Sequence, residues 1–130
     1  MAEDRIEFHH VELVVTQAGT TTRIPALDVV RILYCRMEDE VAQGDEEFHI
    51  LICHQRFVLI GPFAAGGLST ISNLRAARPD IPTAIAKVQS LTRKLRKPGA
   101  LGLRLFPVPG VGVFPISDLP TLAVEGNTDE

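Results

Sequence analysis

Histidine and cysteine are the residues of this chain with the clearest capacity for chemistry, and they cluster in the segment 49–54 (HILICH). A zinc ion requires four nitrogen or sulfur ligands around one point. On an extended strand His49 and Cys53 share a face but lie about 13 Å apart, at ~3.3 Å per residue. Adjacent residues such as Cys53 and His54 point to opposite faces, which separates a thiol from a histidine base. We therefore predict no metal site, no cofactor and no catalytic pair, and we expect Cys35 and Cys53 to be free and buried.

A glycine-rich segment, residues 61–70 (GPFAAGGLST), has a spacing close to that of a phosphate-binding loop. In that loop the second glycine is followed by a lysine for the phosphates and a hydroxyl residue for magnesium. Gly67 and Leu68 stand at those two positions, so we do not expect a nucleotide triphosphatase. Two interpretations remain. In one, the backbone N–H groups of residues 68–70 bind an anion by donating hydrogen bonds to it. In the other, the glycines simply join a strand to a helix.

Charged residues form one basic and one acidic group along the chain. The basic group provides the candidate ligand-binding residues, Arg93, Lys94, Arg96 and Lys97. An acidic ligand such as a lipid headgroup would suit them, and a solvated helix end favoured by the helix dipole is the alternative. The acidic run 38–47 lacks the alternating pattern of a calcium loop, and opposite patches also suit self-association. Because the net charge is -3, we predict no nucleic-acid binding.

The segment 103–116 is apolar and broken by prolines and glycines. Prolines limit hydrogen bonding within a sheet and suit an edge strand, which is normally covered by another chain or by a helix. We therefore predict a homodimer, or a protein partner, bound through this segment, and burial in the monomer core is the alternative. The candidate interface residues are Leu105, Phe106, Val108, Val111, Val113 and Phe114.

The first half of the chain is predicted to be rich in β-strands. Residues 5–16 read as one strand whose apolar face switches at His9-His10, which predicts a β-bulge. A turn at 17–20 leads to a strand at 21–24. Residues 25–43 fit either a helix or a strand at 28–35 followed by an acidic loop, and we favour the strand because of its β-branched residues. The segment 48–60 predicts a tight hairpin at the core of the sheet.

The second half of the chain is predicted to contain two helices. Residues 68–78 and 83–96 carry apolar side chains at helical spacing, and the segment 101–116 reads as short edge strands. The predicted fold class is α+β, with an antiparallel strand-rich sheet or a small, partly open barrel and two helices in the C-terminal half. We expect one globular domain over residues 1–124 and a frayed polar tail over 125–130.

One short pattern occurs twice. Residues 23–29 (RIPALDV) and 113–119 (VFPISDL) both read as a strand, then proline, two residues, an aspartate and an apolar residue. A proline placed before an aspartate that starts a new element produces this pattern in unrelated places. Coincidence is therefore the favoured interpretation.

The order of elements over residues 5–78 resembles the small bacterial pleckstrin-homology-like barrels. The matching features are the first hairpin, the Ile24-Pro25 strand that leads to residues 28–32, the hairpin 48–60 and a helix after Gly61-Pro62. The resemblance implies a scaffold for lipid, peptide or protein contacts. The family shares no catalytic residues, so the resemblance implies none for this chain.

These observations together predict a non-enzymatic binding or assembly module that contacts a protein, a small ligand or a lipid headgroup. The alternative is a small enzyme, or an accessory subunit of one, with a pocket that contains a histidine or a cysteine. The N-terminal residues are polar and no apolar run is long enough to span a bilayer. We therefore expect a cytoplasmic protein.

Overall fold

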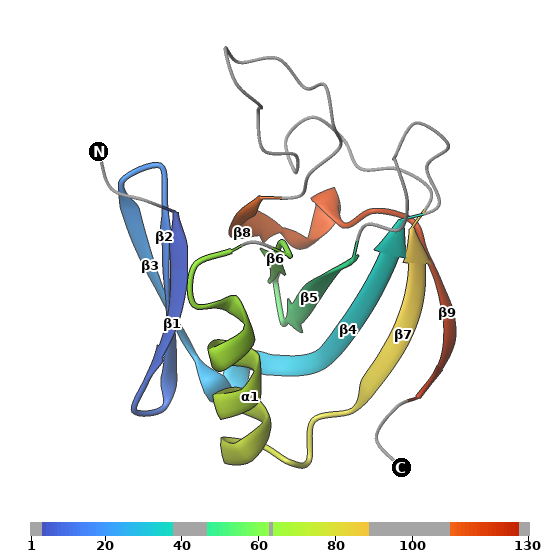
Figure 1. The fold of residues 1–130 in the computed structure, drawn as a ribbon, viewed down its shortest axis with the longest axis horizontal. Coiled ribbons are helices and arrows are strands. Elements are labelled where there is room, and N and C mark those ends of the chain that lie inside the picture. The colour runs from blue at the N-terminus through green and yellow to red at the C-terminus, as the bar shows by residue number, and fades with distance from the viewer. Residues whose placement is uncertain (1–3, 38–46, 63, 89–109, 128–130) are drawn as a thin grey trace.

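Two β-sheets and one α-helix make up the part of the chain that the computed structural model describes, residues 4–37, 47–62, 64–88 and 110–127 (Figure 1). The first sheet has three strands in the order β1-β2-β3, and the second has six in the order β8-β6-β5-β4-β7-β9. Only the pairing of β4 with β7 is parallel among these described strands. The two sheets are not closed into a barrel.

The three-stranded sheet is formed by β1 (Arg5–His9), β2 (Glu12–Gln17) and β3 (Thr20–Pro25). The β-bulge predicted at His9-His10 is wrong: His9 pairs with Glu12, and a two-residue turn reverses the chain there. His10 adopts a φ of 59°, the left-handed conformation that such a turn requires. The switch of apolar face in the sequence therefore marks a hairpin turn.

The second hairpin turn, predicted at residues 17–20, is confirmed. Gln17 pairs with Thr20, and the two residues between them have positive φ angles, 51° at Ala18 and 82° at Gly19. Two successive positive φ angles fit the right-handed twist of a β-hairpin. The Ala18 N–H also donates to the Asp4 carboxylate at 2.9 Å, which ties the N-terminal end of the described chain to this turn.

The centre of the large sheet is formed by β4 (Val29–Met37), β5 (Glu47–Cys53) and β6 (Arg56–Ile60). The predicted strand at 28–35 and the predicted hairpin at 48–60 are both confirmed. The acidic loop expected between Cys35 and Glu47 is wrong at both ends, because β4 continues to Met37 and β5 begins at Glu47. Residues 38–46 lie outside the described residues. The predicted core position of the hairpin is confirmed, because Ile50, Phe57 and Leu59 are fully buried.

The predicted helix at 68–78 is confirmed as α1 (Gly67–Ala77), but the predicted helix at 83–96 is wrong over the residues that the structure describes. Residues 83–88 form strand β7 (Thr83–Val88), which lies between β4 and β9 (Leu122–Asn127). Strand β7 pairs with a neighbour on each side and buries Ala84, Ala86 and Val88, and this tertiary context overrides the helical spacing of the apolar residues. The predicted fold class therefore holds in part: the protein is strand-rich, with one α-helix among its described residues.

Strand β8 (Val111–Pro115) lies at one edge of the large sheet. An edge strand was predicted within the apolar segment 101–116. Residues 101–109 of that segment lie outside the described residues. The outer side of β8 contacts the small sheet, because the Val113 N–H donates to the Gln17 side-chain oxygen at 2.9 Å. Gly112 leaves the room for that side chain, since a Cβ there would overlap it.

The repeated sequence pattern has the same local structure in both places. Pro25 precedes a 3-10 turn at η1 (Ala26–Asp28), and Pro115 precedes one at η4 (Ile116–Asp118). The φ angles of the two prolines are -59° and -60°. In each case the residue after the aspartate donates its N–H to the first carbonyl of the turn. The fixed φ of proline accounts for the shared shape without requiring a common origin.

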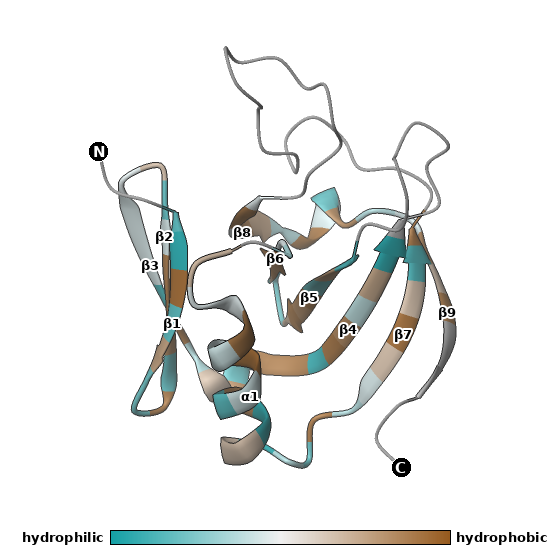
Figure 2. Cartoon of the chain, viewed as in Figure 1, coloured by the Kyte–Doolittle hydropathy of each residue, from teal (hydrophilic) through white to brown (hydrophobic). Residues whose placement is uncertain are grey.

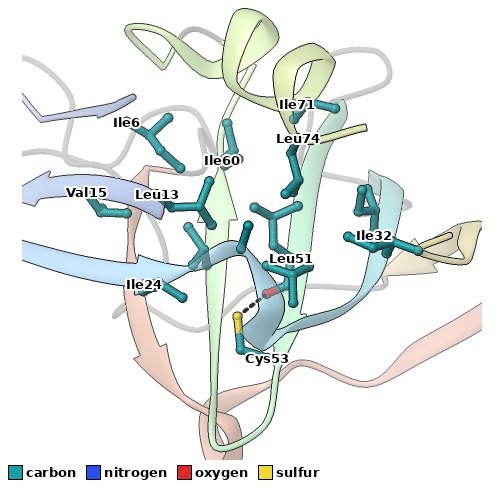
Figure 3. Packing of buried hydrophobic residues seen from close by; sticks show 14 of the residues in the cluster. Ile6, Leu13, Val15, Ile24, Ile32, Leu51, Cys53, Ile60, Ile71 and Leu74 are labelled. Carbon is teal, nitrogen blue, oxygen red and sulfur yellow. Dashed lines mark hydrogen bonds between the residues drawn. The ribbon is translucent and has the colours of Figure 1, made fainter. Parts of the chain in front are cut away.

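The apolar core is divided by the large sheet into two clusters, because successive residues of a strand point to opposite faces. Hydrophobic residues accordingly dominate its central strands (Figure 2). The first cluster lies between the two sheets and α1 and is drawn in Figure 3; its main members are Ile6, Leu13, Val15, Ile24, Ile32, Leu51, Val58, Ile60, Ile71 and Leu74. The second cluster is on the other face and contains Leu33, Cys35, Phe48, Ile50, Phe57, Leu59, Ala84, Ala86 and Val88.

The N-terminal end of α1 is seated directly on strand β1. The Ile6 N–H donates to the Ala65 carbonyl at 3.0 Å, and the Thr70 hydroxyl donates to the Ile6 carbonyl at 3.3 Å. Gly66 has a φ of 79°, and a Cβ at that position would overlap the Ile6 carbonyl oxygen. A Cβ on Gly67 would lie 2.8 Å from Ile60 Cγ2, so the helix also closely approaches β6.

The C-terminal end of α1 is held by Arg78. Its guanidinium donates to the Ala26 carbonyl at 2.7 Å and makes two hydrogen bonds, at 3.0 and 2.9 Å, to the Asp80 carboxylate. The hydrogen bonds from Arg78 lower the pKa of Asp80. The two ends of α1 are thus fixed to different elements, the N-terminal end to β1 and the C-terminal end to η1.

A comparison of two glycines tests the seating of α1. Gly19 and Gly66 have nearly equal positive φ angles, but a Cβ at Gly19 meets nothing within 4 Å. We expect Gly19→Ala to lower the free energy of unfolding by about 1 kcal/mol, the cost of a left-handed alanine. Gly66→Ala should lower it by about 3 kcal/mol, because the helix must also move away from Ile6. Urea unfolding measures both losses of stability. Equal losses would show that the close approach of Gly66 to Ile6 does not contribute to the cost of the substitution.

Candidate functional site

A cavity of ≈ 190 Å³ lies between α1 and the face of the large sheet that α1 covers. A cavity of about 150 Å³ lined by apolar side chains is large enough to hold benzene. This one has room for a small ligand or for one large side chain. Its lining residues are Tyr34, Glu47, His49, Ile60, Gly61, Pro62, Ala64, Gly67, Leu68 and Ile71.

One wall of the cavity is built by the register of three neighbouring strands. Tyr34 of β4 lies directly opposite His49 of β5, and His49 lies opposite Ile60 of β6. The rings of Tyr34 and His49 have centroids 5.3 Å apart and are tilted by 47°. The other wall is α1, where Leu68 and Ile71 are one turn apart. Leu68 is 77% exposed, whereas Ile71 is buried.

Glu47 is the acidic residue of the cavity lining. It is two residues before His49 on β5 and therefore shares its face of the sheet. Its carboxylate lies 3.7 Å from the Arg36 guanidinium, and both side chains are 45% exposed. An exposed pair at this distance contributes about 0–1 kcal/mol, so Arg36 holds the carboxylate only weakly.

The surroundings of the cavity change the titration of His49. Burial lowers the pKa of its imidazole, the positive charge of Arg75 lowers it further, and Glu47 acts in the opposite direction. Its pKa therefore lies below the usual 6.5, and the ring is neutral at neutral pH. A neutral imidazole both donates and accepts a hydrogen bond. His49 can thus bind a polar group without adding charge to the cavity.

The two cysteines are free and buried, as predicted, and neither lines this cavity. Burial raises the pKa of Cys35 to about 12. Burial also raises the pKa of Cys53 to about 11, with a further increase from Asp28 that Arg56 opposes. The Cys53 thiol lies 3.9 Å from the Leu51 carbonyl oxygen, its hydrogen-bond acceptor (Figure 3).

The glycine-rich segment 61–70 supplies the end of the cavity near the start of α1. The Gly67 N–H donates to the Ala64 carbonyl at 3.1 Å, and the Thr70 N–H donates to the Gly66 carbonyl at 3.0 Å. Together with the close approach of Gly66 to Ile6, these bonds favour the structural interpretation of the glycines. They position a helix against a strand.

The residues predicted from the sequence to bind a ligand or a partner fall largely outside this site. Arg93, Lys94, Arg96 and Lys97 lie outside the described residues, as do Leu105, Phe106 and Val108. Val111 is buried, and Val113 packs against the first core cluster. Phe114 packs against Phe57, with ring centroids 5.6 Å apart. The interface expected over residues 103–116 stays a prediction.

Sequence reasoning considered His49 only as a metal ligand and did not single out Tyr34 or Glu47. The sequence signal that could have identified them is a polar or aromatic residue that interrupts the apolar face of a strand. Tyr34 follows Ile32 on one face of β4, and His49 precedes Leu51 on one face of β5. Their contact depends on the register of β4 with β5, which the sequence alone does not provide.

A second hollow, ≈ 440 Å³, lies at the tip of the β5–β6 hairpin and is lined by Asp28, His54, Gln55 and Arg56. The Arg56 guanidinium and the Asp28 carboxylate are 3.9 Å apart. The described residues that line this hollow are all polar or charged, whereas ligand sites are mostly apolar with a few polar groups. The cavity beside α1 is therefore the better candidate.

Two further classes of site were sought among the described residues. No group of three or more His, Cys, Asp or Glu side chains in the described ranges could hold a metal ion. No helix within those ranges is long and apolar enough to cross a membrane.

Comparison with known proteins found no matching protein family, no matching curated protein and no matching solved structure. The resemblance to pleckstrin-homology-like barrels therefore stays a prediction.

The shifted pKa of His49 predicts a contribution to the pH dependence of stability. The unfolded chain binds a proton at His49 near the usual pKa, whereas the folded chain resists it. Stability should therefore fall as the pH is lowered through the unfolded value, and the loss should stop below the folded value. His49→Gln should lose less stability between pH 7.5 and pH 5 than the wild type, measured by urea unfolding. His54→Gln, at an exposed position, is the control, and equal losses in all three proteins would contradict the burial of His49.

The cysteines provide a separate test. Because both thiols are buried and have raised pKa values, their reactive thiolate forms are scarce. We expect a thiol reagent to label the native protein slowly at pH 8 and the urea-unfolded protein rapidly. The variants Cys35→Ser and Cys53→Ser show which cysteine is labelled at each rate. Rapid labelling of either thiol in the native protein would point to an activated cysteine.

Proposed function

We propose that this chain is a non-enzymatic binding module whose small ligand enters the cavity between α1 and the large sheet. The observation that carries this proposal is the composition of the cavity. One wall is apolar and comes from α1 and the loop before it, and the other presents Tyr34, Glu47 and His49. A cavity with these two walls can bury the hydrocarbon part of a ligand and orient the ligand through a few polar contacts.

The arrangement of the described reactive groups favours binding over catalysis. Nucleophilic catalysis requires a nucleophile within hydrogen-bond reach of a base. The cavity contains His49, but neither cysteine lines it, and both thiols are protonated at neutral pH. A small enzyme with a His/Cys pocket is therefore the weaker candidate. Self-association through residues 103–116 is a separate proposal that this site neither requires nor opposes.

The cavity contains its own spectroscopic probe. Tyr34 is the one tyrosine of the chain, and the sequence has no tryptophan. Tyrosine emission therefore reports on Tyr34 alone. We expect 1-hexanol, a transparent probe with a hydrocarbon chain and one polar group, to change this emission in a saturable way.

Two exposed leucines provide a matched pair of variants for that titration. Leu68 lines the cavity and is 77% exposed, whereas Leu27 lies on η1 away from the cavity lining and is 79% exposed. Leu68→Ser should weaken the binding of 1-hexanol about fivefold, because apolar contact area is lost. Leu27→Ser should leave it unchanged. Equal effects of the two variants, or no saturable change in the wild type, would contradict the proposed site.

A further inference from the structure

The charge of the cavity restricts the chemistry of its ligand. Among the described residues that line it, Glu47 is the one carboxylate and none is a lysine or an arginine, and the lowered pKa of His49 keeps its imidazole neutral at neutral pH. A carboxylate or phosphate ligand on the strand wall would meet this negative charge. A cationic ligand would gain from it.

The position of Glu47 allows a ligand to reach its carboxylate. The side chain is 45% exposed, and the Arg36 guanidinium is 3.7 Å away. That distance is longer than a charge-assisted hydrogen bond, which usually measures about 2.7–2.9 Å. An ammonium group can therefore approach the carboxylate more closely than Arg36 does. The aromatic ring of Tyr34 adds a second attraction, because aromatic faces favour cations.

The opposite wall determines how such a ligand is oriented. Leu68 and Ile71 of α1 offer a surface for a hydrocarbon chain. The N-terminal end of a helix carries partial positive charge, and Arg75 of α1 acts electrostatically on His49. Both features disfavour a cation at the helix wall. The charged end of the ligand should therefore face β5 and its hydrocarbon part should face α1.

On the basis of the proposed function, we infer that the ligand of this cavity is a small primary amine with a hydrocarbon part, bound as its ammonium form to Glu47. The volume of ≈ 190 Å³ suits a short alkyl chain or a single ring. The amine forms an ion pair and hydrogen bonds with the carboxylate, and the hydrocarbon part covers Leu68 and Ile71. His49 contributes a neutral hydrogen-bonding group beside it.

Three probes of matched chain length test this inference. Hexylamine, 1-hexanol and hexanoate are titrated into the full chain at pH 7 and low salt, and Tyr34 emission and amide NMR shifts are followed. We expect hexylamine to bind about tenfold more tightly than 1-hexanol, as one charge-assisted hydrogen bond would produce. Hexanoate should bind most weakly. The advantage of hexylamine over 1-hexanol should shrink as sodium chloride is added.

Two glutamate variants locate the charge that matters. Glu47→Gln should reduce the affinity for hexylamine about tenfold, to that of 1-hexanol, and leave 1-hexanol unaffected. Glu12→Gln is the matched control, because Glu12 is also a strand residue paired with an arginine, Arg23, but lies in the small sheet. It should change neither affinity.

The outcomes separate this inference from the proposed function. If 1-hexanol or hexanoate binds as tightly as hexylamine, or if Glu47→Gln weakens all probes equally, the amine inference is wrong and the cavity remains a binding site. If none of the three probes changes Tyr34 emission or the NMR shifts of the cavity residues, the proposed function fails together with it.

Discussion

The contact between the N-terminal end of α1 and strand β1 is the constraint on which the rest of the structure depends. The Ile6 backbone accepts a hydrogen bond from Thr70 and donates one to Ala65. This contact forms only because Gly66 has no side chain and can adopt a left-handed φ. It joins the small sheet to the start of the helix through one backbone–backbone hydrogen bond and one from the Thr70 side-chain hydroxyl, and so satisfies both backbone polar groups of Ile6. The distance of α1 from the large sheet, and hence the cavity between them, follows from it.

The same contact explains why the cavity has two chemically different walls. Gly67 allows α1 to approach Ile60 of β6 closely, and Ile71 and Leu74 of the helix pack in the same cluster as Leu51 of β5 and Ile32 of β4. Where the two walls meet, Ile60 and Ile71 are buried and apolar. Further along the strands, Tyr34, His49 and Glu47 replace the apolar side chains that a closed core would require. All three side chains are only half-buried, and a polar group that keeps contact with water costs little stability.

The sequence could predict the elements that local patterns determine. The hairpin 48–60, the turn at Ala18-Gly19 and the helix at 68–78 each carry their own signal, and the strand at 28–35 was correctly preferred on its β-branched residues. The structure of residues 83–88 is different, because β7 is determined by its partners β4 and β9, which are distant in sequence. The small residues Ala84 and Ala86, both fully buried, suit either a helix or a strand. The candidate site likewise depends on strand register and on the placement of α1. Local patterns therefore indicate only His49, as a metal ligand, and the glycine-rich segment 61–70, as an anion site.

The parallel pairing of β4 with β7 has a consequence for how the chain folds. Antiparallel neighbours such as β5 and β6 meet through a short turn, but β7 can reach β4 only after β5, β6 and α1 have been passed. Pairings between distant segments form slowly, because the chain must close a long loop before any contact offsets its lost entropy. We therefore expect the hairpins and α1 to form first and β7 to dock on them, with β9 joining after β7, its neighbour in the sheet. Until then the β7-facing edge of β4 remains open, and this is the interval in which a folding chain is most exposed to pairing with another chain.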